Sequence, residues 1–177
     1  MSREQLELAT NNVTPEQNIF CVAALLKQFQ HSILQLPSVA PLSTYTCLVH
    51  ALGFTGTTAY TDVANPYPWV FAGAKFAEWL LRSGALQEVP RASAVNGDLV
   101  WYFCADNSFK HVGILRENGR VESKWGTLGL FEHQIFEVPE SYGREVRFFE
   151  ALSFENSIEL FYDFAQENDV QFVERTP

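Results

Sequence analysis

An Asn-Gly pair between two runs of β-forming residues is the feature that most restricts the fold. Asn118 and Gly119 readily adopt the positive φ angles of a two-residue turn, so the residues on either side are expected to pair as antiparallel strands. A denser β-forming run lies before this hairpin, and two weaker runs follow it. The strands expected on these grounds cover residues 99–104, 110–115, 120–124, 134–138 and 145–150.

Helical patterns lie on both sides of the expected sheet. Thr14 and Gln17 have the spacing of a capping box around Pro15, and apolar residues then recur every three or four positions up to Leu36. This pattern predicts a helix that ends before Pro37. Further helices are expected over residues 47–52, 71–82 and 153–168, with irregular loops over 37–46 and 54–69.

The order of helices, strands and a final helix indicates an α+β domain instead of alternating βαβ units. The chain has 177 residues, the length of one domain, and its hydrophobic content of 47% is sufficient for one core. We therefore expect a single domain over 1–177, with N-terminal helices packed on an antiparallel sheet. Its parts are an N-terminal helical segment (1–40), a core (43–150), and a C-terminal helix and tail (151–177).

Charge and cysteine content restrict the partners and the compartment. The chain has 21 acidic and 12 basic residues, a net charge of −9, so we expect neither a nucleic-acid nor a membrane partner. Met1–Gln5 leads into an acidic stretch and not into a secretion signal, and three cysteines suit free thiols. The expected location is cytoplasmic, which is compatible with a bacterial protein, a phage product or a delivered effector.

Cys47 and His111 have the clearest potential for chemistry. Cys47 follows a loop and opens a short helix that Gly53 ends, where helix N–H groups are expected to lower the thiol pKa and to hold an oxyanion. Period-two alternation puts His111 on the same strand face as Gly113, which leaves room for another element or a substrate. A thiol with a nearby imidazole is the arrangement of an activated nucleophile.

Glu122 and Ser123 are the two candidates for a group that orients His111. Both follow the Asn-Gly turn and are expected to lie roughly opposite His111 on the partner strand. Ser123 fits an unbroken hairpin register. Glu122 requires one bulge, but a carboxylate would stabilise an imidazolium more strongly. The sequence leaves both alternatives open.

Three segments around the hairpin form a recognisable set. They are Gly97-Asp98-Leu99-Val100-Trp101-Tyr102, His111-Val112-Gly113-Ile114 and Asn118-Gly119-Arg120-Val121. Together with a cysteine at a helix start, they resemble the core of NlpC/P60 and CHAP domains, which are papain-like cysteine peptidases and amidases. The resemblance covers about residues 43–125 and implies a papain-like fold of the NlpC/P60 type.

By position, the resemblance implies that Cys47 is the nucleophile and His111 the general base, with Glu122 or Ser123 as the third residue. The implied activity is hydrolysis of an amide bond in a peptide or protein substrate, without a metal or a cofactor. The same pair of residues supports glutamine deamidation or acyl transfer, so these reactions remain alternatives. A further alternative is a papain-fold binding module that has lost turnover.

Three residues near the nucleophile are candidates for substrate binding. Tyr45 is placed to help polarise the scissile carbonyl, and Trp125 is a candidate wall of a groove or a core residue. Thr46 takes the place of an aspartate in the Asp-Cys-Ser motif that is usual in NlpC/P60 members. We therefore expect this chain to share the reaction of NlpC/P60 members more readily than their murein substrate.

Other polar residues have simpler interpretations. Cys47 and His50 lie three residues apart, but no second ligand pair completes a zinc site, so we expect no metal. Cys21 and Cys104 lie within a helix stripe and a strand and are expected to be buried apolar residues. His133 is expected to lie in a surface loop.

Overall fold

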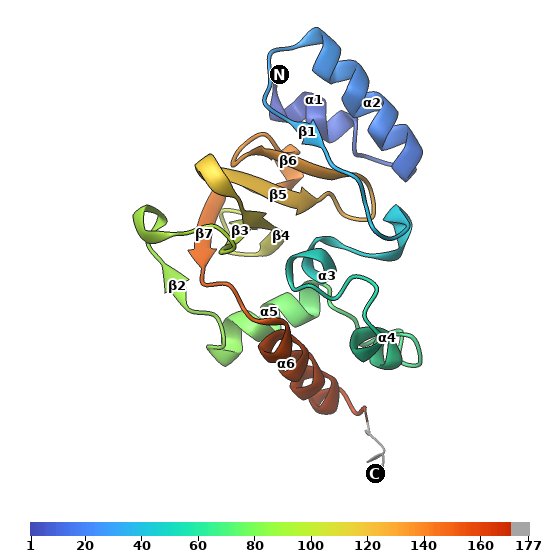
Figure 1. The fold of residues 1–177 in the computed structure, drawn as a ribbon, viewed down its shortest axis with the longest axis vertical. Coiled ribbons are helices and arrows are strands. Elements are labelled where there is room, and N and C mark those ends of the chain that lie inside the picture. Colours follow the sequence, from blue (N-terminus) through green and yellow to red (C-terminus); the bar gives the residue numbers. More distant parts are fainter. Residues whose placement is uncertain (171–177) are drawn as a thin grey trace.

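The computed structural model describes residues 1–170, in which α-helices lie at two ends of a seven-stranded sheet (Figure 1). This is an α+β architecture, as the order of the sequence patterns predicts. The helices are α1 (Arg3–Leu8), α2 (Pro15–Gln28), α3 (Cys47–Ala51), α4 (Thr58–Ala64), α5 (Ala74–Ser83) and α6 (Phe154–Glu167). The strands are β1 (Leu34–Gln35), β2 (Glu88–Val89), β3 (Leu99–Phe103), β4 (Phe109–Leu115), β5 (Arg120–Lys124), β6 (Leu130–Gln134) and β7 (Glu145–Phe149). Short 3-10 helices are η1 (Leu42–Thr44), η2 (Arg91–Ser93), η3 (Glu117–Gly119) and η4 (Glu140–Tyr142).

Neighbouring strands of the sheet run antiparallel in the order β1-β6-β5-β4-β3-β7-β2. Asn118 and Gly119 connect β4 to β5 with φ angles of 59° and 71°. The predicted hairpin is therefore confirmed. Its register places Ile114 opposite Glu122.

Alternation along β3 separates two core layers. Trp101 and Phe103 pack with residues of α3, α5 and α6, whereas Val100 and Tyr102 belong to a cluster on the other face of the sheet. All five residues of β3 are buried. Burial on both faces explains the uninterrupted β-forming run in the sequence.

The N-terminal helices α1 and α2 lie at the opposite end of the sheet from α4, α5 and α6 (Figure 1). Val22 of α2 packs with Trp125 and Phe131 in a third core cluster. Helix α1 was not among the predicted helices, although Ser2 and Gln5 form a capping box at its start. Its six residues are too few for a periodic apolar pattern to be recognised.

The predicted helix from Pro15 to Leu36 is too long, because α2 ends at Gln28. Beyond this point Ser32 is held by side chains that are distant in the sequence. The Glu137 carboxylate accepts hydrogen bonds from the Ser32 N–H and hydroxyl, and Arg120 donates to the Ser32 carbonyl. The chain then continues as β1, which pairs with β6.

Three other expectations need correction. The strand expected at 134–138 lies at Leu130–Gln134, because the chain already turns back after β5, with the Leu128 N–H bonded to the Trp125 carbonyl. The loop expected over 54–69 contains α4, and α5 begins at Ala74, three residues later than expected. The tail 171–177 lies outside the described residues. No helix within residues 1–170 has both the length and the apolar character needed to cross a membrane.

Candidate active site

Helix α3 begins at Cys47, as the sequence predicts. Thr46 precedes it, but the Thr46 hydroxyl donates to the Ala72 carbonyl and does not cap the helix. The N–H groups of Cys47 and Leu48 lie near the Cys47 sulfur and act to lower the pKa of its thiol.

The pKa of the Cys47 thiol is raised, contrary to the sequence-based expectation. Burial is the largest influence on it and favours the neutral thiol. The N–H groups of Val112, Leu48 and Cys47 and the charge of Lys124 act in the opposite direction. The expected helix-start donors are present, but they are outweighed by loss of solvent.

His111 lies on β4 opposite Tyr102 and is fully buried. Its ring stacks on Tyr142, with 4.0 Å between the ring centres and 23° between the planes. Burial, together with the nearby His133, lowers the pKa of His111 far below its usual value, so the imidazole is neutral. Its Nε2 has no hydrogen-bond partner among the described residues.

The start of α3, which carries Cys47, packs against β4, the strand that carries His111. The Val112 N–H, which follows His111 in the chain, acts to lower the pKa of the Cys47 thiol. Val112 and Cys47 belong to the α3 side of the core, whereas His111 lies with Tyr102 on the other side of the sheet. The pKa of Tyr142, which stacks on His111, is raised mainly by burial and also by the Cys47 charge. The thiol is thus within electrostatic reach of the layer that holds His111.

The two candidates for orienting His111 bond other histidines. Glu122 lies on the α3 side of β5, where its Oε1 is 2.9 Å from Nε2 of His50 and its Oε2 accepts from Arg116 at 3.0 Å. Ser123 lies on the other side, with its hydroxyl 2.7 Å from Nε2 of His133. The expected contact of either residue with His111 is therefore absent from the structure. The residue with an orienting carboxylate is His50.

His133, which was expected in a surface loop, and Trp125, which was expected in a groove wall or the core, are both buried. His133 lies on β6, is fully buried, and bonds the Gln134 carbonyl through its Nδ1 in addition to Ser123. Burial lowers the pKa of His133 to about 4. Trp125 is also fully buried, and its ring contacts Phe131. The structure makes Trp125 a core residue and not the wall of a substrate groove.

Tyr45 is buried directly before α3, and its hydroxyl lies 2.5 Å from the Ser38 hydroxyl. Its ring contacts the Nζ of Lys124 at 4.8 Å from the ring centre. Lys124 is a site residue that the sequence interpretation missed. Alternation along β5 could have indicated it, because Lys124 shares the face of Glu122.

Helix α1 holds the loop that carries Tyr142. Arg3 donates to the carbonyls of Val138, Pro139 and Gly143, which flank η4. Glu7 accepts from the N–H and hydroxyl of Ser141. These contacts fix the Tyr142 ring against His111.

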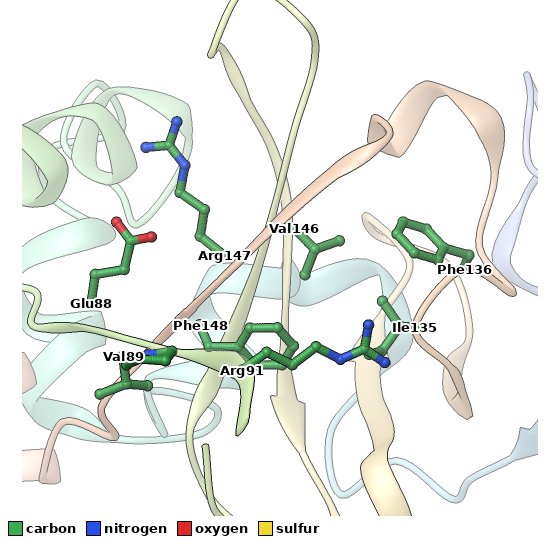
Figure 2. Close-up of a pocket in the computed structure, with 9 residues that line it drawn as sticks. Glu88, Val89, Arg91, Ile135, Phe136, Val146, Arg147 and Phe148 are labelled. Carbon is green, nitrogen blue, oxygen red and sulfur yellow. The ribbon is translucent and has the colours of Figure 1, made fainter. Parts of the chain in front are cut away.

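A hollow of about 250 Å³ lies between β2, β7 and the residues that follow β6. Figure 2 shows Arg91 extending across it toward Ile135, with Phe148 and Val146 on its wall. Phe148 and Ile135 belong to the same core layer as Tyr102. The predicted catalytic residues do not line this hollow.

The structure of residues 1–170 also shows the environment of the three cysteines and the grouping of potential metal ligands. Cys21, Cys47 and Cys104 are all free and partly exposed, so the expected burial of Cys21 and Cys104 is only partial. No group of three His, Cys, Asp or Glu side chains in this range could hold a metal ion. Cys47 and His50 therefore gain no further ligand from the rest of the described chain.

Comparison with known proteins gives a family without an assigned activity. No curated protein and no solved structure matches the chain. A family model described as a domain of unknown function (DUF7689) matches residues 39–150, which is more than half of the chain and includes α3 and the strands from β2 to β7. The chain therefore belongs to the DUF7689 family.

Proposed function

We propose that this chain is a papain-like thiol hydrolase that cleaves an amide bond in a peptide or protein. The observation that carries the proposal is that Cys47 opens α3, which packs against β4, the strand that carries His111. A thiol with N–H donors around it and a neutral imidazole on the adjoining strand are the components of an activated nucleophile.

In the proposed mechanism, the Cys47 sulfur attacks the carbonyl carbon while the thiol proton passes to His111, which requires the imidazole to come within hydrogen-bond reach of the sulfur from the other face of β4. This step requires a neutral imidazole, and burial keeps His111 neutral near pH 7. The N–H groups of Cys47 and Leu48, which act on the sulfur in the free protein, are the proposed donors to the oxyanion. His111 then returns the proton to the leaving amine, and water hydrolyses the thioester to an acid and the free thiol.

A peptidyl vinyl sulfone, which alkylates an activated thiol, tests the proposal. We expect it to modify Cys47 much faster than Cys21 or Cys104, which are also partly exposed. His111→Ala should remove this preference, whereas His31→Ala, in the N-terminal segment, should retain it. Circular dichroism verifies folding, and mass spectrometry of digests locates the adduct. Equal and slow labelling of the three thiols would contradict the proposal.

The reaction type is tested with a peptide pool and Cys47→Ala as the inactive control. Hydrolysis produces fragments that carry a new carboxyl end. Deamidation converts glutamine to glutamate without cleavage, and acyl transfer joins two components of the pool. Products that form equally with Cys47→Ala would exclude Cys47 from all three reactions.

A binding module without turnover is the second candidate function. The observation that favours it is the absence of an orienting partner for His111, whose Nε2 is unbonded among the described residues. The raised pKa of Cys47 has the same implication, because it favours the less reactive thiol. This candidate predicts that His111→Ala does not change Cys47 labelling.

A further inference from the structure

Two aromatic side chains are exposed on the segment between α4 and α5, and together we call them the aromatic patch. Trp69 is 59% and Phe71 48% exposed, whereas Val70 and Ala72, which alternate with them, are fully buried in the core layer of α3. No charged residue occurs over residues 63–74. Neighbouring exposed apolar side chains, unlike single ones, mark binding sites for other molecules.

The local backbone and neighbouring side chains hold both rings in place. The Val70 N–H bonds the Tyr67 carbonyl at 2.7 Å, and the Tyr67 ring meets the Trp69 ring edge-on, with 5.5 Å between the ring centres. Tyr67 itself packs against the core. The Phe71 ring lies against Gly73, where a Cβ would overlap it. An aromatic surface that is already ordered loses little conformational entropy when it binds a ligand.

A hydrogen bond joins this segment to the start of α3. The hydroxyl of Thr46, the residue before the proposed nucleophile, donates to the Ala72 carbonyl at 3.2 Å. The Ala72 N–H donates to the Tyr60 hydroxyl at 3.2 Å, so α4 also holds this point. Phe71 directly precedes Ala72, and the backbone of Trp69 lies within about 10 Å of it, because three residues span no more. The aromatic patch therefore lies beside the start of α3.

We propose that the aromatic patch binds a large apolar side chain of the peptide substrate, beside the amide bond that Cys47 attacks. This inference rests on the proposed function, in which Cys47 is the nucleophile. Two aromatic rings in an uncharged segment favour a leucine or phenylalanine side chain over a charged one, which would lose hydration without gaining a partner. The net charge of −9 opposes binding to an anionic membrane, so a peptide is the occupant that the chain favours.

Binding is measured in Cys47→Ala, so that no turnover is required. The probe is a fluorescein-labelled pentapeptide with leucine and phenylalanine at its centre, and the matched probe has serine and asparagine there. We expect fluorescence anisotropy to show about tenfold weaker binding of the apolar probe after addition of Trp69→Ser or Phe71→Ser. Phe20→Ser is the matched control, because Phe20 is exposed on α2, at the opposite end of the sheet (Figure 1).

Two results of this experiment would overturn the inference. One is an apolar probe that binds no more tightly than the polar probe. The other is an affinity for the apolar probe that neither Trp69→Ser nor Phe71→Ser reduces below that of Phe20→Ser. The two patch variants are read separately, so the test does not depend on the folding of either one.

Acrylamide quenching of tryptophan fluorescence locates the bound peptide without a substitution in the patch. Trp69 is the most exposed of the four tryptophans, because Trp101 and Trp125 are fully buried and Trp79 is partly buried. The unlabelled apolar peptide should therefore protect Trp69 from acrylamide. Unchanged quenching at saturating peptide would overturn the inference. Protection by phosphatidylcholine vesicles but not by the peptide would assign the patch to a lipid surface and would also overturn it.

The inference and the proposed function can fail separately. Two vinyl sulfones, one with leucine and one with serine beside the reactive group, are compared in wild type and in Phe71→Ser. Faster labelling of Cys47 by the leucine reagent, lost in Phe71→Ser, supports the inference. Selective labelling of Cys47 at equal rates by both reagents would overturn the inference alone. Patch-dependent peptide binding without selective labelling of Cys47 would refute the hydrolase mechanism and leave the aromatic patch as a peptide-binding site.

Discussion

Replacing Gly113 by alanine should strongly destabilise the hairpin beside the candidate site. A Cβ at this position would lie 2.5 Å from Cγ1 of Val121, 2.8 Å from the Glu122 carbonyl oxygen and 2.9 Å from Cβ of Ser123. Contacts under 3 Å require the neighbouring strand to move. The carbonyl oxygen belongs to the backbone of β5, so it cannot turn away as a flexible side chain could.

Overpacking of this kind typically costs about 1–3 kcal/mol. We expect Gly113→Ala to reach about 3 kcal/mol, because three atoms of β5 are approached at once. For a chain of this length, that corresponds to a fall in melting temperature of about 6–12 °C. Gly119→Ala is the control: Gly119 has a φ of +71° and open space around its Cβ position, so only the backbone cost of about 1 kcal/mol remains.

Urea unfolding followed by circular dichroism gives the two free energies of unfolding, and a thermal scan gives the melting temperatures. The expected order of stability is wild type, Gly119→Ala and then Gly113→Ala. A loss of less than about 0.5 kcal/mol in Gly113→Ala, the usual range for a neutral surface change, would refute the close approach of β4 and β5. A larger loss in Gly119→Ala than in Gly113→Ala would also refute it.

Three other predictions concern groups around the site. From pH 7 to pH 5 stability should fall by about 2 kcal/mol on account of His133, because its folded pKa is about 4 while the unfolded state takes up a proton near pH 6.5. Urea unfolding at both pH values should show a correspondingly smaller fall in His133→Gln, and an equal fall would reject this assignment. Glu122→Gln should cost about 1 kcal/mol by weakening its two bonds to His50 and Arg116. It should leave vinyl sulfone labelling of Cys47 intact, and lost selectivity would mean that the carboxylate does serve His111. Arg3→Met should accelerate amide hydrogen exchange in the η4 loop, whose carbonyls accept its hydrogen bonds, and unchanged exchange would exclude that restraint.

Local signals were sufficient to predict the centre of the fold. Asn118-Gly119 forms the expected turn, and Gly53 follows α3 with a φ of +73°. Period-two alternation correctly placed His111 and Gly113 on the face opposite Val112. These features depend on residues within a few positions of one another, where sequence patterns are most informative.

The errors arise where partners are distant in the sequence. Helix α2 ends early because Ser32 bonds Glu137 and Arg120, which are 105 and 88 residues away. An apolar pattern that continues to Leu36 gives no sign of these bonds. Tertiary hydrogen bonds therefore override a favourable helical periodicity in this segment.

The orienting group of His111 was wrongly predicted for the same reason. Ser123 meets His133 because β6 lies beside β5, and Glu122 meets His50 because α3 packs on the other face. Both contacts depend on which element covers each face of β5. Hairpin register alone, the argument available from the sequence, could not distinguish His111 from these two competing imidazoles.

Burial is the common cause of the three pKa shifts in the candidate site. It raises the pKa of Cys47 and lowers those of His111 and Lys124, and each change favours the uncharged form. Because α3 has five residues and Cys47 packs against β4, donors at the helix start do not overcome this loss of solvent. The proposed chemistry then cannot begin from a stable thiolate. It requires a proton to leave the sulfur as substrate binds, so its rate depends on the acceptors that β4 and β5 bring to Cys47 more than on the helix that carries it.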